Sequence, residues 1–309
     1  MPKDQMKSEI IDLVLIGDGP LFNHCVNFLR NKKFKIYIIT SLNNSKKLNI
    51  KTDYFINYKK LYKIKKINFL LSIMNGKIIE KNILKKVEYP INFHDGPLPK
   101  YGGLYSSSWA ILNSEKKHGC CWHEMNENVD IGNILSFKNF KIENEDTSYS
   151  IDLKSLYYGF NLFKKDIFRY IKKKKIIVKK RNNKLISYYG RSHFKNIPNL
   201  GFLNFNKSYE YNSKIFRALT TSKEKKNIIF QPKILTSKGV EVIKSITKVK
   251  CKNTNLKKSL NNILKTRGHF ELKYNKNCFR IELKNTKIKS LIIKNNKKIN
   301  YFRYLKLSD

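Results

Sequence analysis

The sequence predicts an α/β fold with a mainly parallel sheet, followed by a smaller β-rich, barrel-like domain. In the first half, apolar runs of strand length such as IIDLVLIG and INFLLSIM alternate with helix-like stretches, as expected for parallel strands that are buried on both faces. In the last third, short alternating strands are separated by Asn-, Lys- and Gly-containing turns, which is typical of small antiparallel barrels. A chain of 309 residues is long enough for both domains.

The chain begins with a predicted βαβ unit. In order, we expect a strand, a helix and a strand over IIDLVLIG, LFNHCVNFLRN and KIYIIT, joined by a right-handed crossover. The GDG turn after the first strand lacks the third glycine of a dinucleotide-binding fingerprint and runs into Pro20, so a plain turn is favoured over a cofactor site. Between Thr40 and Phe69 the chain is short and polar, and we expect one brief strand near DYFIN and little else.

The next elements complete the predicted sheet and cover it. INFLLSIMNG and YPINF are predicted strands on either side of a short helix in KIIEKNILKKV, and LYSSSWAILNSE is a predicted helix. HGCCWHEMN and NILSFKNFKI are predicted to pair across the loop ENVDIGN. A long helix over 147–174 closes the domain, and we expect it to bury an apolar stripe of Tyr149, Leu153, Tyr157, Phe160 and Phe163.

The predicted domain limits follow changes in composition. Residues 1–177 make the first domain, 178–206 a polar and turn-rich linker, and 207–309 the barrel-like domain. The last of these opens with a helix in SYEYNSKIFRALT and continues with strands in NIIFQPKIL, GVEVIKSITKV, HFELKY, NCFRIEL, KSLIIK and YFRYLKL.

The formal net charge of +41 is a feature of many nucleic-acid-binding proteins. Only eight of the 64 basic residues are Arg, the residue best suited to bidentate phosphate contacts. The lysines also run through the whole chain beside abundant Asn and Ile. An AT-rich coding sequence produces this combination for any function, so the charge alone identifies no partner.

Three features of the sequence indicate a cytoplasmic protein. No apolar run reaches the length of a transmembrane helix, and the start MPKDQMKSEI has no signal-peptide pattern. Five cysteines in a chain of this length do not suggest a disulfide framework, and an odd number fits a reducing compartment. We therefore expect a cytoplasmic protein with no membrane partner.

The stretch INFHDGPLPKYGG (91–103) carries the most informative polar residues. Its prolines and glycines end a strand, so Asn92 and His94 are expected at the carboxyl end of that strand, where open α/β sheets bind ligands. Asp130 follows in a loop that could fold back over them. A carboxamide stabilises an oxyanion, an imidazole moves a proton near neutral pH, and a carboxylate raises the imidazole pKa. The three suit acyl transfer to an amine, although each residue type is also common in ordinary turns and caps.

A second group of residues resembles a set of metal ligands. His118, Cys120, Cys121 and His123 lie within six positions. Successive strand residues point to opposite faces, so the adjacent cysteines would diverge, and no second cluster exists to complete a tetrahedral site. Core packing is favoured for this group, and no metal is expected.

Several of these elements together resemble the catalytic half of the 10-formyltetrahydrofolate-dependent formyltransferases. That family includes methionyl-tRNA formyltransferase, sugar N-formyltransferases and the formylation domains of nonribosomal peptide assembly lines. The resemblance covers roughly residues 10–175, and the tail is more weakly similar to the barrel-like C-terminal domain of several members. The shared pattern consists of Asn92-x-His94, GPLP at 96–99, LNSE at 112–115, and Asp130-x-Gly132.

The resemblance implies a Rossmann-like N-formyltransferase that uses 10-formyltetrahydrofolate. Carried over by position, Asn92 would hold the formyl oxygen, His94 would transfer a proton, and Asp130 would assist it. The folate would lie at the strand ends between two loops and against the proline loop. The residues implied for folate binding are Met74, Asn75, Gly76, Asp95, Gly96, Pro97, Leu98, Asn126, Glu127, Asn128 and Val129.

Two departures from the tRNA enzymes bear on the acceptor. HDGPLP stands where those enzymes typically have His-Ser-Leu-Leu-Pro and looks more like the assembly-line and siderophore-type members. The stretch from Thr40 to Phe69 is also too short for their basic loop and helix. We expect an aminoacyl, peptidyl or amino-sugar amine as acceptor, including one on a carrier protein, in nonribosomal peptide or related biosynthesis. Methionyl-tRNA formyltransferase is the alternative, and a non-catalytic nucleic-acid-binding protein is the second. Asp95 either recognises the amine or caps the Gly-Pro turn.

Overall fold

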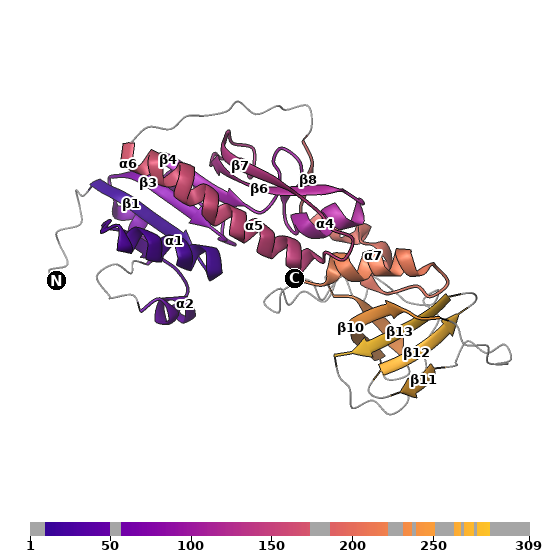
Figure 1. The fold of residues 1–309 in the computed structure, drawn as a ribbon. Helices are drawn as coiled ribbons and strands as arrows, with labels where there is room; N and C mark the ends of the chain where they lie inside the picture. The colour runs from indigo at the N-terminus through magenta and orange to yellow at the C-terminus, as the bar shows by residue number, and fades with distance from the viewer. Residues whose placement is uncertain are drawn as a thin grey trace. The chain divides into compact units, whose positions relative to one another are not determined.

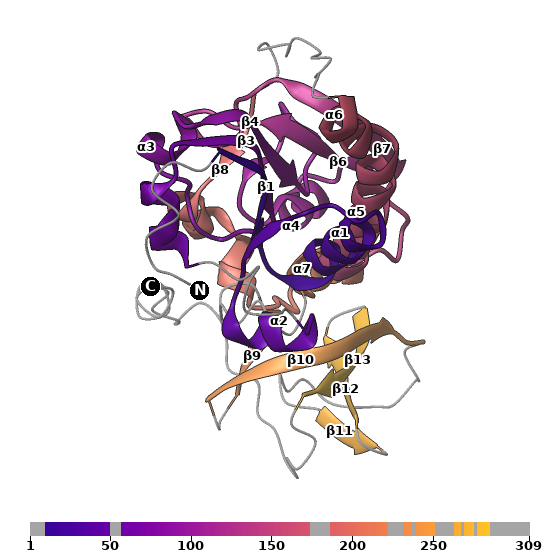
Figure 2. The same ribbon diagram turned by 90° about the vertical axis from the view of Figure 1, so that its left-hand side faces the viewer.

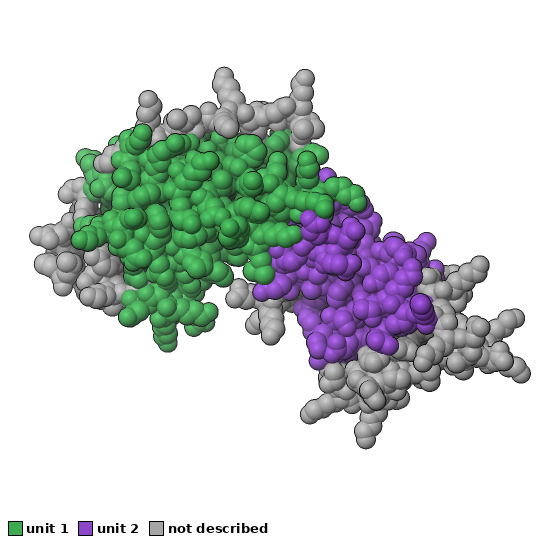
Figure 3. Space-filling model, in the orientation of Figure 1, with its two compact units in different colours: residues 1–106, 116–142, 152–189 green, residues 107–115, 143–151, 190–309 purple. Residues whose placement is uncertain are grey.

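The protein divides into two compact units, which are coloured separately in Figure 3. Unit 1 comprises residues 1–106, 116–142 and 152–189, and unit 2 comprises 107–115, 143–151 and 190–309. The predicted domain limits at 177 and 207 remain a prediction. The computed structural model describes residues 10–49, 57–173, 186–221, 231–236, 239–250, 263–266, 269–274 and 277–284.

Unit 1 is built on a six-stranded sheet with strand order β2-β1-β3-β4-β6-β7 (Figure 1). The four strands β2, β1, β3 and β4 are parallel, and β6 and β7 continue the sheet in antiparallel pairing. The predicted mainly parallel α/β fold is therefore confirmed. The strands are β1 Ile10–Gly17, β2 Tyr37–Ile39, β3 Lys66–Ile73, β4 Val87–His94, β6 Lys117–Glu124 and β7 Ile134–Lys141.

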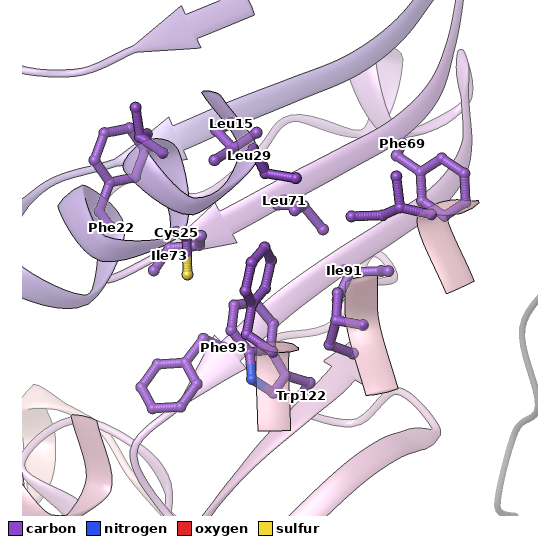
Figure 4. Packing of buried hydrophobic residues seen from close by; sticks show 14 of the residues in the cluster. Leu15, Phe22, Cys25, Leu29, Phe69, Leu71, Ile73, Ile91, Phe93 and Trp122 are labelled. Atoms are coloured by element: carbon purple, nitrogen blue, oxygen red, sulfur yellow. The ribbon is translucent and has the colours of Figure 1, made fainter. Parts of the chain in front are cut away.

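Helices cover both faces of this sheet (Figure 2). On one face, α1 (Gly19–Asn31) and the helix that begins at Ser148 pack over β1, β3 and β4, and Figure 4 shows this cluster. On the other face lie a 3-10 helix (Tyr58–Lys63) and α3 (Lys81–Leu84). Each fully buried Leu, Ile or Phe in these layers contributes about 1.5–3 kcal/mol, which makes the sheet a firm base for the loops at its carboxyl edge.

The segment between Thr40 and Phe69 is more structured than its sequence suggested. It forms α2 (Leu42–Lys47), because Ser41 Oγ accepts the Asn44 N–H at 3.2 Å and so caps the helix. The 3-10 helix Tyr58–Lys63 follows. The strand predicted near DYFIN falls almost entirely outside the described residues.

The long helix over 147–174 is present, but its buried stripe differs from the predicted one. It consists of α5 (Ser148–Leu162), a π-helical turn over Phe163–Ile167 and α6 (Phe168–Lys173). Phe163 is fully buried, whereas the predicted core positions Tyr149, Leu153 and Tyr157 are 43–65% exposed. The buried positions are Ile151, Ser155, Gly159 and Phe163, and Phe160 is partly buried. Gly159 permits a close approach to β4, because a Cβ there would lie 2.4 Å from the Phe93 ring.

Residues 186–206, which we expected to belong to a linker, carry short elements with buried apolar side chains. They form β8 (Tyr188–Tyr189) and 3-10 helices over Arg191–Asn196 and Pro198–Gly201. The apolar residues of FLNF and its neighbours explain the difference, since Phe194, Leu200, Phe202, Leu203 and Phe205 are buried. In unit 1, β8 pairs in parallel with β5 (Gly102–Gly103). The helix α4 (Ser106–Leu112) follows along the chain and belongs to unit 2 from Ser107 on.

Unit 2 contains α7 (Tyr209–Leu219) and a five-stranded antiparallel sheet of order β11-β12-β13-β10-β9, consistent with the predicted β-rich domain. The predicted strands KSLIIK and YFRYLKL lie outside the described residues. Cys278 is disulfide-bonded, a bond that the cysteine count did not lead us to expect. The strands are β9 Lys233–Thr236, β10 Gly239–Lys248, β11 Ile263–Thr266, β12 His269–Tyr274 and β13 Asn277–Leu283.

Candidate active site

The carboxyl end of β4 presents Asn92 and His94 on the same face, because they are two positions apart on one strand. The antiparallel pairing of β4 with β6 places His123 directly opposite Asn92 and Cys121 opposite His94. Asn92 Nδ2 lies 3.1 Å from His123 Nε2. The sheet therefore brings a carboxamide and two imidazoles together at its carboxyl edge.

His94 is held from both sides of its ring and is only 6% exposed. Its Nε2–H donates to the Tyr101 carbonyl at 2.8 Å, and its Nδ1 lies 3.5 Å from Asp130 Oδ2. Gly96 makes room for this arrangement, because a Cβ there would lie 2.6 Å from His94 Nε2 and 2.8 Å from the Tyr101 oxygen.

Asp130 lies between the two histidines, in a loop that does fold back over β4. It adopts a left-handed conformation (φ 57°) and is 8% exposed. Oδ2 accepts the Gly103 N–H at 2.8 Å, and Oδ1 lies 3.5 Å from His123 Nε2. Burial by itself raises the pKa of this carboxyl, but the charges of His94 and His123 and the hydrogen bonds from His123 and Gly103 together hold the pKa well below its usual range. Asp130 is therefore a carboxylate at neutral pH.

Asp95 packs against the protein. Its carbonyl accepts hydrogen bonds from Ser106 Oγ (2.8 Å) and His118 Nε2 (2.9 Å), and its carboxylate oxygen Oδ1 lies 3.2 Å from the same Ser106 hydroxyl. The Asp95 carboxylate thus contacts the first residue of α4, and its two predicted roles, recognition of the amine and capping of the Gly-Pro turn, remain predictions. Gly96, Pro97 and Leu98 continue this turn, in which the Leu98 N–H donates to the Gly96 carbonyl at 3.1 Å.

The two loops implied for folate binding flank the site. Met74 follows β3 with φ 51° and is 41% exposed; Asn75 bonds across the turn to Lys77, and Gly76 has open space around it. On the other side, Asn126 Oδ1 accepts the Asn128 N–H, and Val129 is 42% exposed. Glu127 of the second loop forms an exposed 2.7 Å ion pair with Lys81 of α3. They offer exposed apolar side chains beside backbone polar groups.

A pocket of about 340 Å³ opens beside Asp130. Asp130 carries the one charge among its lining residues, and Ile131, Ile186 and Tyr188 give it an apolar wall. The wall is anchored by β8 pairing with β5 and by Ser187 Oγ, which accepts the Tyr101 N–H at 2.9 Å. The lining residues are Gly102, Val129, Asp130, Ile131, Ile186, Ser187 and Tyr188.

Sequence reasoning missed several parts of this site. It identified Asn92, His94 and Asp130, which the structure does bring together, but it took His123 for a core residue. The pairing of the strand HGCCWHEMN with YPINF could have revealed His123 only with the register known, since a slip of one residue turns the side chain to the other face. The wall over 186–188 carries no sequence signal, because it lies far along the chain in a polar stretch.

The remaining members of the predicted ligand-like group have other partners. His118 bonds to the Asp95 carbonyl, and Cys121 Sγ lies 3.6 Å from the Gly96 carbonyl oxygen. Burial raises the pKa of the Cys120 thiol to about 12. Across the described parts of the chain, no three His, Cys, Asp or Glu side chains are grouped so that they could hold a metal ion. Within the same parts, no helix is both long and apolar enough to cross a membrane.

Comparison with known sequences gives a family match over most of unit 1. Residues 24–161 match the formyl transferase family. The bifunctional polymyxin resistance protein ArnA of Wigglesworthia glossinidia brevipalpis is 32% identical over 173 residues, which are 56% of this chain and 25% of that protein. The methionyl-tRNA formyltransferase of Clostridium beijerinckii is 29% identical over 202 residues, which are 60% of this chain and 64% of that protein. The chain thus spans a quarter of the first relative and less than two thirds of the second.

Solved structures extend the likeness of fold to most of the chain. The sugar 3N-formyl transferase WlaRD, crystallised with dTDP and 5-N-formyl-THF, superposes with a TM-score of 0.66 at 22% identity, covering 90% of this chain and 99% of that one. The N-formyltransferase of Helicobacter canadensis, in complex with folinic acid and dTDP-3-aminofucose, gives 0.66 at 23% identity, covering 88% and 99%. At these identities the likeness establishes the fold.

Proposed function

We propose that the chain is an N-formyltransferase that moves the formyl group of 10-formyltetrahydrofolate to a primary amine, because residues 24–161 match the formyl transferase family. An amino sugar is the first candidate acceptor, because the solved structures that cover nearly the whole chain include enzymes acting on sugars. The observation that carries the proposal is the cluster of Asn92, His94 and Asp130 at the carboxyl end of β4. Aminoacyl and peptidyl amines, including those on carrier proteins, remain in the proposed acceptor class.

The cluster suits the chemistry of the transfer. The acceptor nitrogen forms a bond to the formyl carbon, the bond from that carbon to N10 of the folate breaks, and one amine proton ends on N10. Negative charge develops on the formyl oxygen in between. Asn92 Nδ2 has two hydrogens and uses one toward His123, so the second is available to the oxyanion. A donor placed in this way typically contributes a hundredfold or more to the rate, or roughly 3 kcal/mol.

The proton has a path through Asp130 and His94. Asp130 lines the pocket and His94 Nδ1 lies 3.5 Å behind it. The carboxylate stabilises the imidazolium that forms when His94 takes the amine proton, and that proton then passes to N10 of the folate. Nε2 is held by the Tyr101 carbonyl, so the proton travels through the Asp130 carboxylate to Nδ1, and the 3.5 Å contact between them is expected to shorten when substrate binds.

The charge of the pocket supports an amine acceptor. A protonated amine is attracted to the Asp130 carboxylate, and the carbon framework next to it can pack on Ile131, Ile186 and Tyr188. Val129 lines the same pocket, and the exposed Met74 at the end of β3 offers further apolar surface to a flat ring system. The residues present therefore fit a folate and an amine as co-substrates.

The proposal is tested by following the loss of 10-formyltetrahydrofolate while separate acceptors are offered: a nucleotide-linked amino sugar, methionyl-tRNA and an aminoacyl carrier protein. Formylation of the amino sugar is the expected outcome. Asn92→Ala should lower turnover about a hundredfold or more while folate affinity is nearly kept. Near wild-type turnover in that variant, or transfer to none of the amines, contradicts the proposal.

A second candidate is methionyl-tRNA formyltransferase. It is favoured by the Clostridium beijerinckii relative and by the net charge of +41. If the lysines reflect coding composition, tRNA binding should be weak, unselective and lost steeply with salt. Tight binding that selects the initiator methionyl-tRNA at physiological salt makes this second candidate the answer.

A further inference from the structure

His123 is a buried histidine at the centre of the site that the family pattern of Asn, His and Asp does not include. It is 2% exposed and lies on β6, opposite Asn92. One ring atom, Nε2, faces two groups of the site: Asn92 Nδ2 at 3.1 Å and Asp130 Oδ1 at 3.5 Å. The amide hydrogen of Asn92 needs a lone pair on Nε2, whereas the carboxylate of Asp130 needs a hydrogen on Nε2.

The hydrogen bond of the other ring nitrogen, Nδ1, determines whether Nε2 of the neutral ring carries a hydrogen. His123 Nδ1 lies 2.8 Å from the Glu124 carbonyl oxygen, which can only accept, so Nδ1 carries a hydrogen. In the neutral ring Nε2 then has a lone pair and accepts a hydrogen from the Asn92 carboxamide. In the charged ring Nε2 is a donor, and it can no longer accept from Asn92. Its donor contact is then Asp130 Oδ1.

We propose that His123 is a positioning residue for the transfer: when neutral it orients the Asn92 carboxamide through Nε2, and when protonated it releases Asn92 and pairs with Asp130. The inference rests on the proposed function, since it gives Asn92 its orientation for the formyl oxygen. It differs from the roles of His94 and Asp130, because His123 acts through Asn92 and moves no substrate proton.

The surroundings of His123 support both states. From β4 it faces Asn92 and the ring of His94, whose centroid is 6.4 Å away, and from the loop it faces Asp130. On β6 its neighbour Glu124 offers the carbonyl, while the Glu124 carboxylate is bonded to Asn133. On β7 the paired residue is the apolar Ile134. Asp130 remains ionised well below neutral pH, so the charged ring always has an acceptor.

A direct test needs no acceptor substrate. Nitrogen NMR of the full chain labelled with ¹⁵N-histidine, assigned with His123→Gln, reports which ring nitrogen carries hydrogen. At pH values where His123 is neutral, Nδ1 should be protonated and Nε2 should have the shift of an acceptor, and Asn92→Ala should move the Nε2 resonance. An Nε2-protonated neutral ring, or an Nε2 shift that ignores Asn92→Ala, overturns the proposal whether or not formyl transfer is found.

Kinetics test the consequence, with the acceptor that gives the fastest wild-type rate. Gln offers an acceptor oxygen that does not titrate, whereas Leu offers none. His123→Gln should keep kcat within about threefold and lose the part of the acid limb that follows the His123 protonation seen by NMR. His123→Leu should lower kcat roughly ten- to hundredfold, the scale of a small misplacement of a reacting group, with folate affinity unchanged.

The exposed His24 of α1 provides the matched control, since His24→Gln should leave both kcat and the acid limb as they are. Equal losses in the Gln and Leu variants, or an unchanged acid limb in His123→Gln, overturn the proposal. Melting curves of both variants accompany the kinetics. If His123→Leu melts early, the NMR shift of Nε2 and the pH profile of His123→Gln decide alone.

Discussion

At the scale of single residues, the position of His94 depends on a glycine at position 96, which has no side chain. Gly96 lies so close to the His94–Tyr101 hydrogen bond that a Cβ would come within 2.6 Å of Nε2. The neighbour on the other side is the Tyr101 carbonyl, which is main chain and cannot swing away as a flexible side chain would. An alanine at position 96 therefore has to displace the imidazole ring, the loop or both.

We predict that Gly96→Ala lowers kcat at least tenfold, because displacement of a reacting group by about 1 Å can cost a hundredfold. Folate affinity should change less than kcat, because the added Cβ meets the His94 ring and the Tyr101 carbonyl and not the exposed Met74 and Val129. Steady-state kinetics and a folate titration measure the two effects. An unaltered kcat would show that the hydrogen bond from His94 to Tyr101 does not matter in the transfer.

The position of a site residue could be predicted from the sequence only where its spacing along one strand determines which face it lies on. Asn92 and His94 are two apart on one strand, which alone puts them on one face. His123 is brought opposite Asn92 by the register of two strands that are separated along the chain by β5, α4 and the connecting loops. Nothing in the local sequence fixes that register, so only the folded sheet reveals His123.

At the scale of elements, a two-residue strand completes the site. β8 pairs with β5, and between them Ser187 Oγ accepts the N–H of Tyr101, a residue that is 4% exposed and has φ 60°. The Tyr101 ring also stacks on Tyr189, with centroids 5.6 Å apart and planes at 13°. Tyr101, whose carbonyl holds His94, is thus bonded directly to the segment that forms the pocket wall.

Ser187→Ala should leave the buried Tyr101 N–H without its acceptor, at a cost of about 1–3 kcal/mol. The melting temperature should fall and the acceptor KM should rise, because the same loop and wall line the pocket. Ser45→Ala, which removes an exposed hydroxyl bonded to the Leu42 carbonyl in α2, is the control and should change neither. A fall in stability with an unchanged acceptor KM would show that the wall does not contribute to acceptor binding.

Elements with long apolar runs were predictable, and short ones held by distant partners were not. The sequences IIDLVLIG and INFLLSIM could be predicted as the strands β1 and β3, because a strand buried on both faces needs continuous apolar residues. β8 has only two residues and exists because β5 lies beside it. The face of α5 was misjudged because its buried positions Ile151, Ser155 and Gly159 form a different stripe, and Gly159 is the position at which the helix comes close to Phe93.

At the scale of the whole molecule, the two units hold ionisable groups with opposite responses to pH. In unit 2, Lys233 is 1% exposed; its Nζ donates to the Leu200 and Gln231 carbonyls and lies 5.0 Å from the centre of the Phe202 ring. Burial lowers the pKa of Lys233 to about 7. Between about 7 and the unfolded value near 10.4, the unfolded chain binds one more proton than the folded one. Stability therefore rises with pH across this window and is lowest below it.

We predict that this contribution has a slope of up to about 1.4 kcal/mol per pH unit between pH 7 and 10. Lys233→Met should remove that slope from the unfolding free energy, measured by denaturant titration at several pH values. Lys248→Met, at an exposed lysine paired with Glu210, should keep it. Equal slopes in the two variants would mean that Lys233 is charged in the folded protein throughout this range. In unit 1 the sign is reversed, since Asp130 has a lowered pKa and its contribution is lost only in acid.

The pairing of β8 with β5 sets an order of events during synthesis. As the chain leaves the ribosome, β4, β6 and β7 emerge early enough for the sheet to assemble around Asn92 and His94 while translation continues. The wall from Ile186 to Tyr188 is still untranslated at that stage, so the nascent sheet has its reactive groups but no complete pocket around Asp130. The pocket in which we propose that the amine binds is thus complete only after Tyr189 has emerged and paired beside Gly103, and a ribosome stalled before that point would carry a chain without this pocket wall.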